Sequence, residues 1–353
     1  MAFDDGVCSP NRASLTRAFP RASLGHFPTP LEPAPRLSAE HGLAAPILVK
    51  RDDCSGLAFG GNKVRQLEYY MGDAQACGAT MVLITGAVQS NYVRTVAASA
   101  ARLGMKCVAQ LEDRVVGKGP LYHSSGNVLL DHLLGAEVMH YAHGEDESGA
   151  DANLEARAQS ARAAGEVPYV IHLSEQPRPL GALGYVAGAE EIVEQLAHDQ
   201  GAVHTVVVAS GSAVTHAGLL VGLRAMGWHS VDVVGACVRR GASQQAARVL
   251  RVARTVEAML GCAQVVQAAD VIVDDEALGE GYGTLNTMTS SAIRDGARFE
   301  GLILDPVYTG KSFACALKWA GQRAERAGST LFVHTGGSPA VFAYGDTLIE
   351  ALT

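Results

Sequence analysis

The sequence predicts an α/β fold in which largely parallel sheets are covered by helices. Strand-like runs alternate with helix-like runs along most of the 353 residues, and this alternation is typical of βαβ units. Loops rich in glycine or hydroxyl residues follow several of the predicted strands and open the next helix. The length favours two doubly wound domains or one large one. Because ligands of such folds bind at the carboxyl ends of the strands, function should be sought in those loops.

The predicted elements follow in order along the chain. The first is a short buried strand at 47–49, then a loop at 52–61 and a helix whose apolar residues keep helical spacing until Gly78. Further strands are predicted at 81–85, 106–111, 169–173, 203–209, 232–238 and 330–333. Further helices are predicted at 91–103, 125–134, 184–196, 215–226 and 243–260. The Asp/Glu/Gly/Ala stretch at 144–152 is predicted to be an exposed loop that leads to a helix.

The composition is that of a globular protein acting on small molecules. The net charge is −8 and no Lys/Arg cluster occurs, which disfavours nucleic acid and anionic membranes as partners. Residues 1–35 contain no apolar stretch typical of a signal peptide, and no run is long enough to cross a membrane. The seven cysteines include no CxxC pair. Neither a metal cluster nor a disulfide framework is therefore expected, and the predicted location is a reducing cytoplasm.

Lys63 is the candidate for covalent chemistry. Gly60 and Gly61 precede Asn62 and Lys63 at the start of a predicted helix. Asn62 suits the N-cap position, and the glycines let the backbone pass close to a bound group. A lysine held there can form an imine with an aldehyde cofactor. The alternative is a solvated lysine in the first helical turn, which the helix dipole slightly disfavours.

Two loops offer sites for anions. The loop after strand 81–85 carries Gln89, Ser90 and Asn91 at a helix start, where free N–H groups and polar side chains can hold a carboxylate. Ordinary helix capping by Ser90 or Asn91 is the alternative interpretation. The loop after strand 203–209 combines hydroxyls, a glycine and a helix start, which suits a phosphate. Its residues are Ser210, Gly211, Ser212, Ala213, Val214 and Thr215.

Two nucleotide-binding motifs are excluded. Gly-Lys-Ser at 310–312 would end a P-loop, but Asp305 stands where that motif needs glycine. Neither 210–215 nor 279–283 has the GxGxxG spacing of a dinucleotide site. The last loop, at 334–337, could instead bring the Thr335 hydroxyl and bare backbone against a flat ring.

Five motifs together resemble one family of pyridoxal-phosphate enzymes. They are Gly-Gly-Asn-Lys at 60–63, Gln-Ser-Asn at 89–91, Pro-Leu-Gly-Ala-Leu-Gly-Tyr at 179–185, Asp-Pro-Val-Tyr-Thr-Gly-Lys at 305–311 and His-Thr-Gly-Gly at 334–337. Their order is similar to that of the D-cysteine desulfhydrase and 1-aminocyclopropane-1-carboxylate deaminase family, a group that includes L-cysteate sulfo-lyase. The resemblance extends over roughly 28–344.

The resemblance implies the architecture and the cofactor. It implies pyridoxal 5'-phosphate and the tryptophan-synthase-β-like fold (fold type II). The implied large, cofactor-binding domain comprises 1–66 and 177–353, and the implied small domain comprises 67–176. A homodimer is also implied by the resemblance.

The resemblance further implies a role for each matched residue. Lys63 matches the Schiff-base lysine, which also moves the α-proton of the substrate. Ser90 with Gln89 matches the loop that holds the substrate carboxylate. Asn91 matches the residue that bonds the phenolic oxygen of the cofactor and lies in the same substrate loop. Residues 210–215 fall where the family binds the phosphate.

Tyr282 and Tyr308 match two tyrosines on the substrate side, so both are candidate catalytic residues. The chain also departs from the family. Thr309 stands where the deaminases have glutamate. The family often carries a basic residue at the position of Gln66, and a residue other than tyrosine at the position of Tyr92.

These departures favour α,β-elimination. A neutral threonine, Thr309 or Thr335, cannot keep the ring nitrogen of the cofactor protonated as a carboxylate does. The weaker electron sink still suffices when a good leaving group is present on Cβ. The predicted reaction converts a β-substituted amino acid into pyruvate, ammonia and the leaving group, as D-cysteine desulfhydrase does. L-cysteate sulfo-lyase and aminocyclopropane deaminase activity are alternatives, and a non-catalytic pyridoxal-phosphate-binding protein is an alternative of another class.

Overall fold

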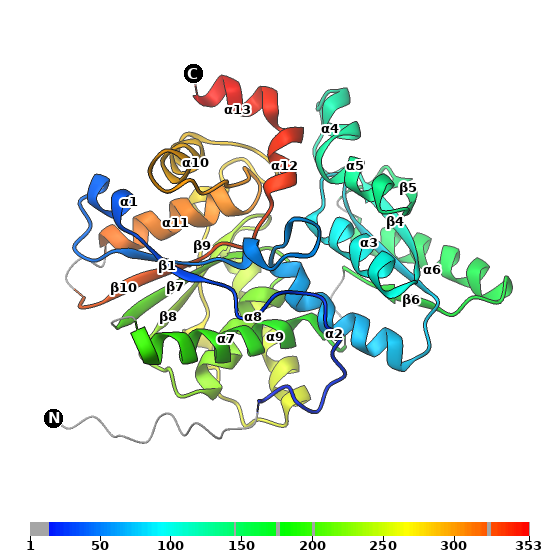
Figure 1. The fold of residues 1–353 in the computed structure, drawn as a ribbon, viewed down its shortest axis with the longest axis horizontal. Helices are drawn as coiled ribbons and strands as arrows, with labels where there is room; N and C mark the ends of the chain where they lie inside the picture. Colours follow the sequence, from blue (N-terminus) through cyan, green and yellow to red (C-terminus); the bar gives the residue numbers. More distant parts are fainter. Residues whose placement is uncertain (1–13, 145, 174–176, 200–201, 323–325, 353) are drawn as a thin grey trace.

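The computed structural model describes residues 14–144, 146–173, 177–199, 202–322 and 326–352, and Figure 1 shows their arrangement. Two separate sheets form the framework. Within the described residues, no helix is both long and apolar enough to cross a membrane.

The larger sheet has six strands. Strand β1 pairs with β2 antiparallel, and all other pairs are parallel. Every residue of the central strand β7 is buried, as expected for a strand covered on both faces. The strand order is β1 (Leu31–Ala34), β2 (Ile47–Lys50), β10 (Ser329–Val333), β7 (Val203–Ser210), β8 (Asp232–Cys237) and β9 (Ile272–Asp274).

Helices cover both faces of the larger sheet. Figure 1 shows α1, α10 and α11 on one side and α7, α8 and α9 on the other. Helices α7 and α8 pack closely because Gly218 has no side chain; a Cβ there would lie 2.2 Å from the carbonyl oxygen of Ala182. The helices are α1 (Pro35–Glu40), α7 (Gly181–Asp199), α8 (Val214–Ala225), α9 (Ala242–Leu260), α10 (Thr287–Glu300) and α11 (Thr309–Gln322).

The smaller sheet has four strands, all parallel. Helices α3 and α6 pack against it, and α2 contacts both α3 and α7. The strand order is β5 (Glu137–Tyr141), β4 (Lys106–Glu112), β3 (Met81–Ala87) and β6 (Pro168–Ile171). The remaining helices are α2 (Asn62–Ala76), α3 (Asn91–Leu103), α4 (Pro120–Ser124), α5 (Gly126–Leu133), α6 (Glu147–Ala163), α12 (Ser338–Ala343) and α13 (Gly345–Leu352).

The predicted strands and helices are all present, with shifts of a few residues at their ends. The prediction of a loop over 144–152 was wrong, because α6 begins at Glu147. Its N-cap is Asp146, whose Oδ1 accepts from the N–H of Gly149 at 2.9 Å. The sequence interpretation also missed the strands β1, β5 and β9. All three are short strands at a sheet edge, and most of their residues are not fully buried, so their apolar pattern is weak.

Candidate active site

A cavity lies where the carboxyl ends of strands from both sheets meet the starts of several helices. Its walls come from the ends of β3 and β7, the loop after β8 and the first turns of α2, α3, α6 and α8. Ten of the predicted site residues line it, although they come from distant parts of the sequence. These are Lys63, Ser90, Asn91, Gly211, Ser212, Ala213, Thr215, Tyr282, Tyr308 and Thr335.

Two glycines place Lys63 at the cavity wall. Gly61 has φ +111° immediately before α2, and a Cβ on it would lie 3.0 Å from the carbonyl oxygen of Thr335. A Cβ on Gly336 would lie 2.7 Å from the Cα of Gly61. The two backbone segments therefore approach more closely than side chains would allow, and they leave a flat wall of bare backbone beside Lys63.

The amine of Lys63 is prepared for nucleophilic attack. Its Nζ donates to Oε1 of Gln66 at 3.2 Å and lies 4.7 Å from the ring centroid of Tyr92. Burial lowers the pKa of Lys63 to about 8, because the charged form loses hydration. The neutral amine, which is the form that attacks an aldehyde, is thus more populated near neutral pH than in an ordinary lysine. Gln66 and Tyr92, which the sequence analysis noted as departures from the family pattern, thus both contact this amine.

Thr215 presents a hydroxyl donor to the cavity. Its Oγ1 accepts from Nδ2 of Asn62 at 3.0 Å and from Nε2 of Gln66 at 2.7 Å. A hydroxyl has two lone pairs and one proton, so its proton remains for an acceptor in the cavity. Helix α8 begins beside it, after Ala213 with φ +74°, and the N–H groups of its first turn have no helical acceptor. This donor set fits a phosphate group.

Ser90 and Asn91 line the cavity at the start of α3. Ser90 is the N-cap, and its Oγ accepts from the N–H of Val93 at 3.3 Å. Oδ1 of Asn91 accepts from Nδ2 of Asn127 at 3.0 Å, which orients the amide. Ser90 thus caps α3, as the alternative interpretation predicted, and it also lines the cavity.

Gln89, predicted with Ser90 to belong to the loop that holds the substrate carboxylate, does not line the cavity. Its Nε2 donates to the carbonyl oxygens of Tyr122 and Ser125, at 2.6 and 3.0 Å, and its Oε1 accepts from the N–H of Asn127. Both ends of the amide are therefore engaged in holding the 122–127 segment.

Two residues of the predicted phosphate loop, Ser210 and Val214, do not line the cavity. The hydroxyl of Ser210 is buried, accepts from Nε2 of Gln245 at 2.8 Å and lies 3.3 Å from Nδ1 of His216. Val214 is the first residue of α8, so only its backbone is placed to serve an anion. The predicted phosphate residues that line the cavity are Gly211, Ser212, Ala213 and Thr215.

Thr309 was predicted as a candidate for the cofactor ring, and its hydroxyl is engaged with Asp305 at the start of α11. Its Oγ1 donates to Oδ2 of Asp305 at 2.7 Å and accepts from the N–H of Asp305 at 2.7 Å. Asp305 also accepts from the N–H groups of Val307, Tyr308 and Thr309. Thr309 therefore closes the turn that starts α11. Of the two threonines predicted as candidates for the cofactor ring, Thr335 lines the cavity.

Tyr282 and Tyr308 form a pair at the cavity. Their hydroxyl oxygens are 2.7 Å apart, and their rings meet edge to face at 5.9 Å. Burial raises the pKa of both phenols, so both stay protonated near neutral pH and can donate hydrogen bonds. Lys311, the lysine of the rejected P-loop motif, donates to the carbonyl oxygens of Leu278 and Gly281 at 2.7 Å and so holds the loop that carries Tyr282.

Sequence reasoning missed four charged residues that line the same cavity. Arg114 follows β4, Glu147 opens α6, and Arg239 and Arg248 come from the segment after β8. Nη1 of Arg239 lies 2.6 Å from Oε1 of Glu147, and Nη1 of Arg248 lies 3.6 Å from Oε2. No local motif marks these positions, because their elements are far apart in the sequence.

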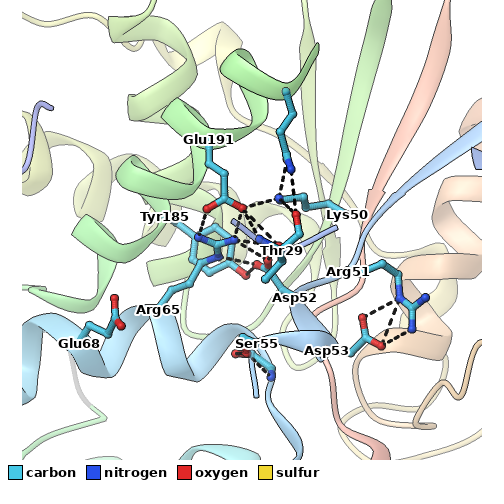
Figure 2. Close-up of polar contacts among 12 residues, drawn as sticks. Thr29, Lys50, Arg51, Asp52, Asp53, Ser55, Arg65, Glu68, Tyr185 and Glu191 are labelled. Carbon is cyan, nitrogen blue, oxygen red and sulfur yellow. Dashed lines mark hydrogen bonds and ion pairs between the residues drawn. The ribbon is translucent and has the colours of Figure 1, made fainter. Parts of the chain in front are cut away.

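A buried ionic network anchors the start of α2, as Figure 2 shows. The guanidinium of Arg65 donates twice to Asp52, at 3.0 and 2.8 Å, and twice to Glu191, at 2.9 and 2.8 Å. The hydroxyl of Tyr185 donates to Oδ2 of Asp52 at 2.5 Å, and Lys50 pairs with Glu191. Arg65 lies two residues after Lys63, so this network ties the first turn of α2 to α7 and to the loop after β2.

Comparison with known proteins gives consistent relatives. D-cysteine desulfhydrases of Klebsiella pneumoniae subsp. pneumoniae and Salmonella choleraesuis are 43% and 42% identical to this chain over 94% of its length, covering 98% and 97% of those proteins. The crystal structure of an ACC deaminase homologue superposes with a TM-score of 0.84 at 34% identity, covering 96% of this chain and 98% of that one. A hydrogen sulfide-producing enzyme from Fusobacterium nucleatum shares the fold, with a TM-score of 0.62 at 15% identity over 88% of this chain and 95% of that one.

These likenesses confirm the predicted fold type II architecture and the predicted cofactor, pyridoxal 5'-phosphate. The sequence profile of pyridoxal-phosphate dependent enzymes matches residues 22–336. Nearly the whole described chain is therefore accounted for by one family. The protein belongs to the pyridoxal-phosphate dependent enzymes.

Proposed function

We propose that this protein is a lyase that eliminates the Cβ substituent of an amino acid, releasing pyruvate, ammonia and the leaving group. The observation that carries the proposal is a lysine of lowered pKa that shares one cavity with a phosphate-type donor set and with Ser90. D-Cysteine is the first substrate to test, because the relatives named above are D-cysteine desulfhydrases. L-Cysteate sulfo-lyase activity is the alternative of the same class.

Different residues of the cavity would hold different parts of the cofactor. Lys63 would bond the aldehyde carbon, Gly211 to Ala213 and Thr215 would hold the phosphate, and Asn91 would donate to the phenolic oxygen. When bound, pyridoxal phosphate supplies an electron sink for the pair released at Cα. Thr335 offers the ring nitrogen a hydroxyl but no negative charge.

The remaining groups are placed to act on the substrate. Ser90 and the N–H groups at the start of α3 would hold the carboxylate. Lys63, released by the substrate amine, would remove the Cα proton. Tyr282 and Tyr308 bond to each other, so one hydroxyl proton of the pair would remain to donate to the leaving group as its bond to Cβ breaks.

The test of the proposal is a screen of β-substituted D- and L-amino acids for pyruvate. Pyruvate from D-cysteine or a β-chloroalanine, formed only with cofactor-loaded protein, is the expected result. A preparation that takes up pyridoxal phosphate but releases pyruvate from no such substrate would instead indicate the non-catalytic binding protein.

Replacing Ser90 with alanine should impair turnover and spare the cofactor. The hydroxyl is expected to bind the substrate carboxylate, and loss of a hydrogen bond to a charged group costs about 1.5–3 kcal/mol, or about 10- to 100-fold in kcat/KM. The visible cofactor band should remain, and stability should fall by about 1 kcal/mol, as for a lost N-cap. Ser160→Ala on the outer face of α6 is the matched control. Loss of the band in Ser90→Ala would show that the loop binds the cofactor instead.

Aminocyclopropane carboxylate should be a poor substrate. Opening its ring expels no leaving group from Cβ, so this reaction depends most on a protonated ring nitrogen, and each unit by which the ring-nitrogen pKa falls is worth about 1.4 kcal/mol of sink strength. We expect kcat/KM for 2-oxobutyrate formation to be at least about 100-fold below that for pyruvate from the best β-substituted substrate. Equal efficiency on one preparation would contradict the assignment of neutral Thr335 to the ring nitrogen.

We also propose the domain division, with 67–176 as the small domain and 1–66 with 177–353 as the large one, and a cytoplasmic homodimer. The four-stranded sheet lies within the small domain, which supports the domain division. The six described cysteines are free thiols, which supports a reducing cytoplasm. Exposed apolar side chains on α5, α12 and α13, which contact one another through α12, support a self-association surface. They are Leu129, Leu133, Phe342 and Ile349. Light scattering at the mass of one chain would refute the dimer.

A further inference from the structure

Arg94 is a fully buried arginine that bridges two helices of the site. It lies in the first turn of α3, where its N–H donates to the carbonyl oxygen of Ser90 at 3.3 Å. Its Nη1 donates to the carbonyl oxygen of Ala58 at 2.5 Å, and its Nη2 donates to that of Gly60 at 3.2 Å. The side chain therefore connects the start of α3 to the segment that immediately precedes Lys63.

The charge of Arg94 is not used in a direct ion pair. Among the described residues, Nε of Arg94 and both carboxyl oxygens of Asp131 on α5 have no hydrogen-bond partner. Burial lowers the pKa of Arg94 to about 10 and raises that of Asp131 to about 8, since both charged forms lose hydration. A buried guanidinium without a bonded carboxylate is costly. Its role should therefore be sought in the backbone that it binds.

The backbone that Arg94 binds is strained. Ala58 and Phe59 have φ of +43° and +69°, in the left-handed region that residues with a side chain rarely adopt. Such strain persists only where surrounding contacts hold it. The side chain of Phe59 is 59% exposed, so packing of its ring does not offset the strain. The two hydrogen bonds from Arg94, to the carbonyl groups of Ala58 and Gly60, are placed to hold this conformation.

The conformation of this segment sets the position at which α2 begins. The N–H of Gly61 donates to the carbonyl oxygen of Asp52, and the N–H of Asn62 donates to that of Thr335, both at 3.0 Å. These bonds lie within two residues of Lys63. A change of φ at 58–59 would therefore move the first turn of α2, which carries Lys63, relative to the start of α3.

We propose that Arg94 is a positioning residue for proton transfer. It fixes the start of α2 relative to the start of α3, so that the amine of Lys63 reaches the Cα proton of a substrate held at Ser90. This rests on the proposed elimination and adds a residue that does not line the cavity. A misplacement of about 1 Å at a reacting group can cost about 100-fold in rate.

Exchange of the Cα proton of alanine in D2O isolates this step. Alanine has no leaving group on Cβ, so nothing is eliminated. Lys63 would take the Cα proton, and the electron pair of that bond would pass into the electron sink that the cofactor supplies. A deuteron from the solvent would then return to Cα and bond to the same pair. NMR of D- and L-alanine with the holoenzyme measures the rate.

The test variant is Arg94→Met/Asp131→Asn, which removes the guanidinium and leaves no buried carboxyl behind. Its exchange rate should fall about 100-fold, while KM for alanine stays within about threefold because Ser90 is unchanged. Borohydride should still place the label on Lys63. The midpoint of chemical unfolding should not fall, because apolar replacement of a buried ion is often neutral or stabilising.

Two controls accompany this variant. Asp131→Asn alone should exchange alanine at the wild-type rate. Arg102→Met removes another arginine of α3 that donates to a backbone carbonyl, that of Leu24 at 2.9 Å, and it should also match wild type.

Glycine at 58 and 59 tests whether Arg94 acts through the strained segment. Glycine adopts a positive φ without strain, so Ala58→Gly/Phe59→Gly should raise the exchange rate of the Arg94 double variant by about tenfold. In the wild-type background the same two changes should leave the rate within about threefold. Without turnover, the N–H groups of Gly60 and Gly61 should exchange with solvent at least about tenfold faster in the Arg94 double variant, as read by mass spectrometry.

The outcomes separate the positioning role from the elimination itself. An exchange rate within about threefold of wild type in the Arg94 double variant, or no recovery with the two glycines, would overturn the positioning role. Loss of the label on Lys63 together with a lower unfolding midpoint would overturn it as well, because Arg94 would then only stabilise the fold. A wild-type holoenzyme that neither exchanges alanine nor releases pyruvate from any β-substituted amino acid would instead refute the elimination.

Discussion

Replacing Lys63 with alanine is expected to abolish elimination, lowering kcat by at least about 1,000-fold. The amine has two tasks, bonding the cofactor and moving the Cα proton, and a positioned proton-transfer group alone is typically worth about 100- to 10,000-fold. The purified variant should also lose the visible band of the covalently held cofactor. Steady-state release of pyruvate and an absorption spectrum measure the two effects separately.

Lys106→Ala is a suitable control because that amine lies at the surface and pairs with Glu166. It should retain both the band and the activity. A Lys63→Ala protein that still turned over at a tenth of the wild-type rate would show that another group removes the proton.

Replacing Arg65 with methionine is expected to destabilise the protein by about 3–5 kcal/mol. The guanidinium is 2% exposed and neutralises Asp52 and Glu191, so its removal leaves buried carboxylates with fewer partners. Because Arg65 anchors the turn that carries Lys63, cofactor affinity should fall as well. Chemical denaturation measures the first effect and cofactor titration the second.

The surface pair of Arg157 and Glu137 provides the comparison, since Arg157→Met should cost no more than about 1 kcal/mol. A cost that small for Arg65→Met would show that α2 is held by packing alone.

The network also predicts that the stability of the protein depends on pH. Interactions with Arg65 hold the pKa of Asp52 and Glu191 below their usual values, despite burial. Their stabilisation is therefore present at neutral pH and is lost as the pH falls below about 4.

The sequence was sufficient for the parts of the site that lie in one strand-loop-helix unit. Lys63, Ser90, Asn91 and Thr215 each stand at a helix start, and helix starts can be recognised from caps, glycines and apolar spacing. The parallel order of the strands then brings these starts to one edge of the framework. The family resemblance supplied the order of the motifs and the identity of the cofactor.

Side-chain direction within the loops could not be predicted in the same way. Gln89, Ser210 and Thr309 belong to the predicted loops, yet each turns away from the cavity to satisfy a neighbouring polar group. Choosing between neighbouring hydroxyls requires the tertiary hydrogen-bond network, which no local pattern encodes.

The charged wall of the cavity was missed for a different reason. Arg114, Glu147 and Arg239 come from three segments that meet only in the folded chain. In the sequence each looks like an ordinary solvated charge, and 144–152 was interpreted as an exposed loop. Arg114 lies close to the end of a predicted strand, and this position was the one signal in the sequence that could have pointed to the cavity.

The most direct test of the account is to reduce the cofactor-loaded protein with borohydride and map the labelled peptide. Reduction makes the bond between cofactor and amine permanent, so the attachment site can be read by mass spectrometry. The account predicts one pyridoxyl label, on Lys63 in the peptide that contains Gly60 to Arg65. A label on Lys311, the other lysine whose pKa burial lowers to about 8, or no label on any lysine, would contradict it.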